Sequence, residues 1–208
     1  MALNYLLSMI KKLLAEALGT FALVFVVMSA VATGSLITPL LAGLTLGLMV
    51  YFVGHISGTH INPGVTIGAW SIGKISLEEG AGYIVAQFIG AGIAMLAINA
   101  FLPGASADIA SAVAAANTSL VLFAEALGMF FFTFGIASVI YGKTPRNLSG
   151  IVVGLSLTLG IIFASVGSAG ILNPAVAMGL GAFNVMYILG PIIGSILGMQ
   201  AYKYLMLK

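Results

Sequence analysis

The chain has 208 residues, of which 61% are hydrophobic and only 6% are charged. Soluble domains carry about 25% charged residues, so this composition excludes an ordinary soluble domain and indicates a protein of the lipid bilayer. The sequence has no cysteine, which excludes disulfides and thiolate chemistry, and its net charge of +2 gives no support for a nucleic-acid partner.

Long apolar runs predict six membrane-spanning helices, because about 20 apolar residues cross a bilayer. The ranges, in chain order, are 11–32, 36–57, 80–101, 118–141, 148–168 and 184–206. Residues 1–14 are expected to be an interfacial lead into the first span, not a removed signal peptide, because Lys11 and Lys12 interrupt their apolar run. Two further segments, 58–79 and 169–183, are too apolar for ordinary loops and too short to span.

The basic residues predict the orientation. With six spans, all seven fall on one side of the membrane: Lys11, Lys12, Lys74, Lys143, Arg146, Lys203 and Lys208. The connections on the opposite side hold none. The excess of Lys and Arg in cytoplasmic loops therefore predicts a multi-pass protein of the cell membrane (plasma or inner membrane) with both termini in the cytoplasm.

The two halves of the chain repeat each other. The segment AEALG at 15–19 recurs at 124–128, GLT at 43–45 recurs as GLS at 154–156, and NPGV at 62–65 recurs as NPAV at 173–176. Tyr83-Ile84 with Gly90 likewise recurs as Tyr187-Ile188 with Gly194. A repeat of three spans enters the membrane the second time from the opposite side. We expect one membrane domain over 1–208, with an inverted repeat at about 11–101 and 118–206 joined by 102–117.

Each Asn-Pro pair predicts the start of a short helix, because Asn is a good N-cap and Pro suits the first helical position. Ten residues from Asn62 span roughly 15 Å, about half of the hydrocarbon core. Two half-helices that enter from opposite faces would meet by their N-termini near the midplane. Paired discontinuous helices of this kind indicate a permeation site.

The segment GHISGTHINP at 54–63 resembles the first signature loop of the aquaporin and glycerol-facilitator (major intrinsic protein) family, and GILNPA at 170–175 resembles the second. The similarity covers about residues 12–204. It implies an all-α membrane protein, with six transmembrane helices and two half-helices in a right-handed aquaporin-like bundle. It also implies a passive channel for water or small neutral solutes, with no enzyme activity and no cofactor or metal, assembled as a homotetramer. The pore midplane would comprise Asn62, Pro63, Gly64, Asn173, Pro174 and Ala175.

Further site residues follow from the resemblance and from the chemistry of the bilayer. Glu16 and Glu125 are costly in a span unless they have partners. The resemblance implies that they brace the backbones of the two Asn-Pro loops, and coupling to transport is the alternative. His60 is expected to hold its loop through a hydrogen bond. His55 either faces the cytoplasmic half of the pore or packs as an ordinary histidine.

The family's outer constriction, or selectivity filter, maps by counting from the two asparagines to Ala42, Ile161, Gly170 and Val176. Water-selective members and glycerol facilitators carry an arginine at the last position, so Val176 marks a divergent member. Small and aliphatic side chains predict a wider, more apolar ring with fewer hydrogen-bond donors. Three outcomes are open: passage of larger neutral solutes such as glycerol, urea or metalloid hydroxides, slow water conduction, or leakage of cations.

Two other functions fit parts of the pattern. A secondary transporter also uses inverted repeats and broken helices, but only Glu16 and Glu125 are available as a coupling site. An intramembrane enzyme would use His55, Ser57 and His60. The two histidines lie about 140° apart around a helix, and no third ligand or orienting acid is near in sequence, so we predict no catalytic or metal site.

Overall fold

The computed structural model describes residues 2–113 and 119–206. Its described part contains six helices that are long and apolar enough to cross a membrane, as the sequence predicts. They are α1 (Ala2–Ala32), α2 (Thr38–Ser57), α4 (Leu77–Phe101), α6 (Ser119–Ile140), α7 (Ser149–Ala164) and α9 (Val185–Met206). Between them lie the shorter helices α3 (Pro63–Ser71), α5 (Ala105–Val113) and α8 (Pro174–Gly179), and a 3-10 turn at Arg146–Leu148.

Most helix ends lie within three residues of the expected ones, and three larger differences remain. Helix α1 begins at Ala2 and continues through Lys11 and Lys12 without a break, so the expected lead and the first span form one helix. The connection at 102–117 holds α5, although residues 114–117 lie outside the described part. Helix α7 ends at Ala164, four residues early, because the chain turns there to carry Ser168 to Glu125.

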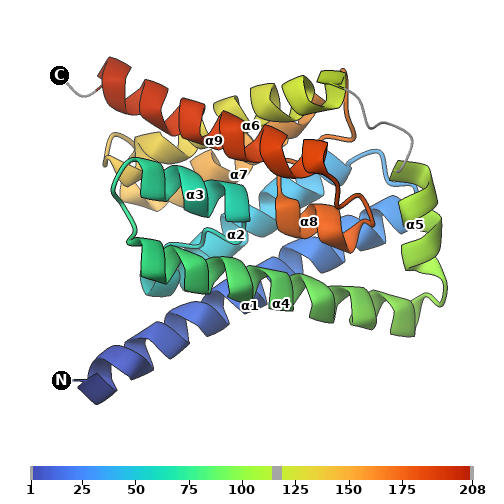
Figure 1. Cartoon of the computed structure of the whole chain (residues 1–208), viewed down its shortest axis with the longest axis horizontal. Helices are drawn as coiled ribbons and strands as arrows, with labels where there is room; N and C mark the ends of the chain where they lie inside the picture. Colours follow the sequence, from blue (N-terminus) through green and yellow to red (C-terminus); the bar gives the residue numbers. More distant parts are fainter. Residues whose placement is uncertain (1, 114–118, 207–208) are drawn as a thin grey trace.

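The inverted repeat is visible in the arrangement of the helices. Helix α1 packs along α4 in the first half, α6 packs along α9 in the second, and α2 packs against α7 between the halves. Figure 1 shows α3 and α8 in the middle of the bundle, between α4 and α9, with their N-termini toward each other.

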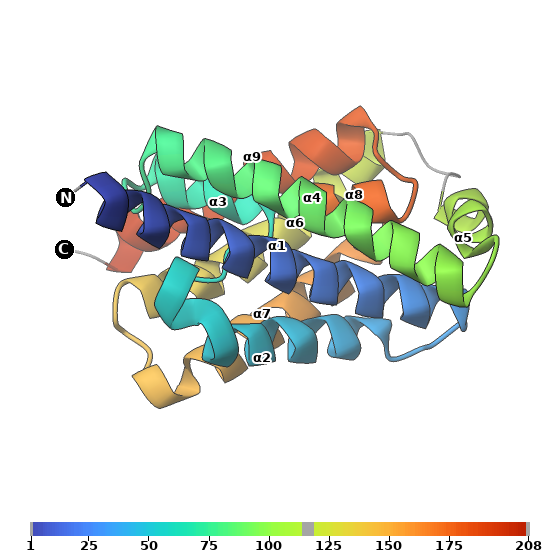
Figure 2. The ribbon, with the colours of Figure 1, turned by 90° about the horizontal axis from the view of Figure 1, so that it is seen from below.

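The helix ends agree with the predicted even number of spans. In both views the beginning of α1 and the end of α9 lie at the same end of the molecule (Figures 1 and 2). The α3–α4 and α6–α7 connections lie at that end as well, and α5 lies at the opposite end (Figure 2). These segments hold Lys11, Lys12, Lys74, Lys143, Arg146 and Lys203, whereas Lys208 lies outside the described residues. The basic residues of the described chain are therefore grouped at one end of the bundle.

Glycines allow α1 to approach α4 closely and α6 to approach α9 closely. These glycines occupy equivalent positions in the two halves of the chain. A Cβ on Gly90 of α4 would overlap the carbonyl oxygen of Ala17, and a Cβ on Gly194 of α9 would overlap that of Ala126. Backbones that touch in this way are typical of membrane helices, which associate through small residues. The unusual glycine content is thus explained in part by helix contacts.

Candidate functional site

The two half-helices are capped by the asparagines of the repeated motif. Asn62 Oδ1 accepts hydrogen bonds from the backbone N–H of Gly64 at 2.8 Å and of Val65 at 3.4 Å. Asn173 Oδ1 accepts the equivalent bonds from Ala175 at 2.9 Å and from Val176 at 3.4 Å. Pro63 and Pro174 follow as the first helical residues. The predicted helix starts are therefore confirmed in both halves.

The same two side chains join the halves to each other. Asn62 Nδ2 donates to the carbonyl oxygen of Leu172 at 2.9 Å, and Asn173 Nδ2 donates to that of Ile61 at 3.0 Å. Each amide nitrogen carries two protons, so each has a second N–H that these bonds do not use. Two donors are thereby held side by side where the half-helices meet.

Glu16 lies fully buried on α1 and accepts four hydrogen bonds. Its Oε1 accepts from Ser57 Oγ at 2.7 Å and from the backbone N–H of His60 at 2.9 Å. Its Oε2 accepts from the backbone N–H of Ile61 at 2.6 Å and from Gln87 Nε2 at 2.8 Å. One carboxylate thus holds the loop that leads into α3.

Glu125 on α6 repeats this arrangement for the second loop. Its Oε1 accepts from Ser168 Oγ at 2.7 Å and from the backbone N–H of Ile171 at 2.9 Å, and its Oε2 accepts from Leu172 N–H at 2.6 Å. Pro191 occupies the position that Gln87 has in the first half, so Glu125 has no counterpart of the Gln87 bond.

The bonds of the two serines and of Gln87 to the glutamates were not predicted, and Ser57 was named above only for the alternative of an intramembrane enzyme. Ser57 and Ser168 are 111 positions apart, which is the shift between the two Asn-Pro motifs. Extending the repeat a few residues upstream of each motif would therefore have found the serine pair. Gln87 has no partner in the repeat, so the sequence offers no such signal for it.

The loops hold non-glycine residues in the left-handed backbone region. The φ angles are 53° at Thr59, 39° at Ile61 and 55° at Leu172. Such angles are rare for branched side chains and have to be maintained by their surroundings. The glutamate bonds to the loop N–H groups supply that support.

The two histidines have different environments. The His60 ring lies with Nδ1 3.2 Å from Thr66 Oγ1, and its edge faces the Tyr83 ring at 5.3 Å between centroids. His60 also lines the cavity beside the two asparagines that is described below. His55 is exposed near the end of α2 and does not line this cavity. Among the described residues no group of His, Cys, Asp or Glu is arranged to hold a metal ion.

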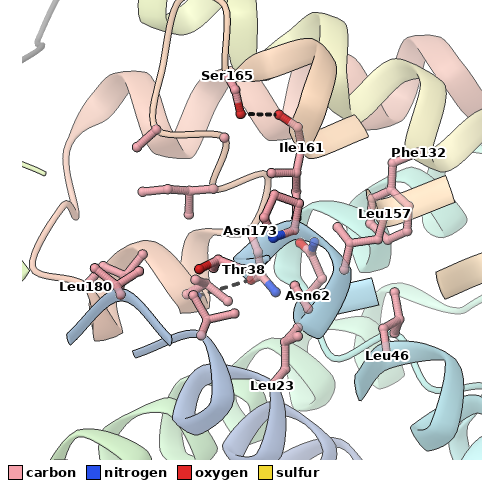
Figure 3. Close-up of a pocket in the computed structure, with 18 of the residues that line it drawn as sticks. Leu23, Thr38, Leu46, Asn62, Phe132, Leu157, Ile161, Ser165, Asn173 and Leu180 are labelled. Carbon is pink, nitrogen blue, oxygen red and sulfur yellow. Dashed lines mark hydrogen bonds between the residues drawn. The ribbon is translucent and has the colours of Figure 1, made fainter. Parts of the chain in front are cut away.

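A cavity of about 320 Å³ lies beside the asparagines. All four positions of the expected filter line it, namely Ala42, Ile161, Gly170 and Val176. Asn62 and Asn173 lie next to each other at one wall of the cavity, with aliphatic and aromatic side chains around them (Figure 3), including Leu23, Leu46, Phe132 and Leu157. Among the residues that line it, none is Asp, Glu, Lys or Arg.

Comparisons with known proteins agree with this geometry. The family model of the major intrinsic proteins matches residues 5–202. The chain is 33% identical to Aquaporin NIP1-3 of Oryza sativa, over 93% of this chain and 73% of that protein. It is 31% identical to Aquaporin AqpM of Methanothermobacter marburgensis, over 96% of this chain and 99% of that protein. The X-ray structure of the aquaglyceroporin from Plasmodium falciparum has the same fold, with a TM-score of 0.74 and 21% identity over 96% of this chain and 97% of that one.

Proposed function

The chain belongs to the major intrinsic protein family, and from this premise we propose that it conducts small uncharged solutes such as glycerol, urea and metalloid hydroxides as well as water. Membership makes it a multi-pass membrane protein and a passive channel for water or small solutes, not an enzyme. The choice of solutes is the part that we infer from the residues of the pore.

The composition of the cavity carries this proposal. Ala42, Ile161, Gly170 and Val176 line it together, and none of their side chains has a polar atom. A ring without an arginine leaves more room for a solute and offers it fewer donors, so discrimination against molecules larger than water is weaker. The resulting pore would be wide and apolar on this side of the asparagines.

The asparagines would supply the polar contacts that a solute needs at the midplane. The unused N–H groups of Asn62 and Asn173 would donate to a water or hydroxyl oxygen. The N-termini of α3 and α8 each add a positive partial charge of about +0.5, which orients the oxygen toward them and repels cations. Pro63, Gly64, Pro174 and Ala175 would keep the two helix starts at this point.

The remaining site residues would support this pore. We propose that Glu16 and Glu125 brace the loops through the bonds described above, and that His60 steadies the first loop against Thr66. His55 would face the cytoplasmic half of the pore. The channel would form one domain with repeats at about 11–101 and 118–206 joined by 102–117, assemble as a homotetramer, and lie in the cell membrane with both termini in the cytoplasm.

Stopped-flow light scattering on proteoliposomes tests the function. Gradients of water, glycerol and urea should each give a flux that rises linearly with concentration and depends weakly on temperature. A saturable, gradient-coupled uptake would instead support a secondary transporter. A proton-sensitive dye inside the vesicles tests the alternative that the channel leaks cations. The observation that supports this alternative is that no charged side chain lines the cavity.

Replacement of Val176 by arginine should narrow the range of solutes. The long guanidinium side chain would fill part of the cavity and add donors, so glycerol and urea flux should fall by about tenfold with a smaller loss of water flux. Any proton leak should fall as well. Val176→Leu is the control, because it adds bulk without charge or donors. Unchanged glycerol and urea flux in Val176→Arg vesicles would contradict the proposed filter.

A further inference from the structure

The two Asn-Pro loops correspond residue by residue. Thr59 N–H donates to Ser57 Oγ at 3.1 Å, and Gly170 N–H donates to Ser168 Oγ at 3.0 Å. Both serines donate in turn to the glutamate of their own half at 2.7 Å. Thr59 and Gly170 also share the left-handed backbone region, with φ of 53° and 65°. The shift of 111 therefore holds through the loops and not only at the motifs.

The same shift maps the outer ring onto a second ring in the other half of the pore. Ala42, Ile161, Gly170 and Val176 form the outer ring that lines the cavity. Because the repeat is inverted, we expect their counterparts to surround the pore on the far side of the asparagines. We call these counterparts the inner ring, and they are Val153, Val50, Thr59 and Val65, in the same order.

The inner ring carries more side-chain bulk than the outer ring. Thr59 stands where the outer ring has glycine, and Val153 stands where it has alanine. Val50 is one methylene smaller than its counterpart Ile161, and Val65 matches Val176. Two positions therefore gain several atoms and only one loses any.

Contacts place two of the four inner-ring side chains, Thr59 and Val50, side by side. A Cβ built on Gly54 would lie 3.5 Å from Thr59 Oγ1 and 3.7 Å from Val50 Cγ1, so both side chains border the same point. Thr59 Oγ1 donates to the carbonyl oxygen of Met49 at 3.3 Å, which fixes its rotamer. Thr59, Val65 and Val153 are all buried. The cavity reaches every outer-ring residue and none of the inner ring.

The backbone at Thr59 adds an independent observation. A β-branched residue at a φ of 53° is strained, whereas glycine adopts this angle freely. A threonine here puts a side chain into the inner half at an energetic penalty that the outer half avoids with Gly170. Strained residues of this kind gather at active sites, ligand clamps and switch regions.

We propose that the inner ring of Val50, Thr59, Val65 and Val153, rather than the outer ring, sets the largest solute that passes the channel. This inference rests on the proposed function, since it concerns the solute range of that pore. Three valines and a threonine whose hydroxyl already donates to the backbone form a tight apolar collar. The outer cavity then serves as a vestibule in which a solute loses part of its hydration before it meets the asparagines.

Matched alanine variants test the inner ring. Val65→Ala and Val176→Ala make the same substitution at equivalent positions of the two rings. In proteoliposomes, Val65→Ala should raise the flux of glycerol and of the larger erythritol by about tenfold relative to water, and Val176→Ala should raise it by a much smaller factor, because the outer ring is already wide. Val153→Ala and Thr59→Gly copy the outer-ring residues and should act as Val65→Ala does. They keep the test decisive if Val65→Ala fails to insert.

The outcomes separate this inference from the function on which it rests. If the wild type passes glycerol and urea, and the two alanine variants respond equally or the outer one responds more, the inner ring does not set the limit and the proposed function stands. If the wild type passes water alone, the proposed solute range is wrong. In that case, if Val65→Ala passes glycerol and Val176→Ala does not, the result still supports the inner ring as the limit. If neither variant passes glycerol, the inference about the inner ring is wrong.

Discussion

Replacement of Glu125 by alanine is expected to prevent the channel from folding stably. The substitution removes the acceptor for Ser168 Oγ and for the backbone N–H groups of Ile171 and Leu172, all within a site where Glu125 is fully buried. Each buried donor left without a partner destabilises the folded state by about 1–3 kcal/mol. Together they destabilise it by several kcal/mol, and flux should be lost.

Thermal unfolding of the purified protein in detergent measures this effect, with solute flux as the second readout. Glu125→Gln retains one carbonyl oxygen and should fall between the wild type and Glu125→Ala. Glu78→Ala is the matched control, because Glu78 is an exposed glutamate in the first turn of α4. Such a surface change should shift stability by about 0.5 kcal/mol or less. If Glu125→Ala unfolds at the wild-type temperature and conducts normally, Glu125 does not brace the loop.

Alanine at Gly90 and at Gly92 should change stability in opposite directions, although both glycines lie on α4. A Cβ at position 90 would overlap the backbone of Ala17, so α1 and α4 would have to separate. Overpacking of this kind destabilises by about 1–3 kcal/mol, and by more where backbone blocks the added atom. A Cβ at position 92 meets nothing within 4 Å. Gly92→Ala should therefore stabilise α4 by about 0.5–1 kcal/mol, since alanine favours the helix.

The melting temperatures of the two variants in the same detergent test this prediction. Gly194→Ala in the second half should reproduce the loss seen with Gly90→Ala, because its Cβ would overlap the carbonyl of Ala126 in the same way. A Gly90→Ala protein as stable as the wild type would mean that the helices are able to adjust at this contact. The inverted symmetry would then contribute less to packing than the structure indicates.

The parts of the fold that were predictable from the sequence are those set by local chemistry. Hydropathy gave the six spans because each span is a continuous apolar run. The half-helices were predictable because Asn62 and Asn173 cap them through bonds to residues two and three positions ahead. Helix α5 was missed, since the short helix lies in a connection without a long apolar run.

Features that depend on distant segments were not predictable. The left-handed angles of Ile61 and Leu172 arise because Glu16 and Glu125, more than 40 positions away, draw their N–H groups inward. Gln87 reaches Glu16 across 71 positions. The filter positions could be named by counting, because the family resemblance supplied the register. Their meeting around one cavity depends on the packing of α2, α7 and the second loop.

The crossed amide bonds also bear on how the protein is made. Asn62 donates to Leu172 and Asn173 donates to Ile61, so neither half contains both partners of its own central bond. The first three spans leave the ribosome before the second loop has been synthesised. Asn62 therefore has no acceptor for its central bond until Leu172, 110 residues later in the chain, has been made. The pore centre therefore cannot be completed before the second loop has been synthesised, and the first half alone lacks a finished pore centre.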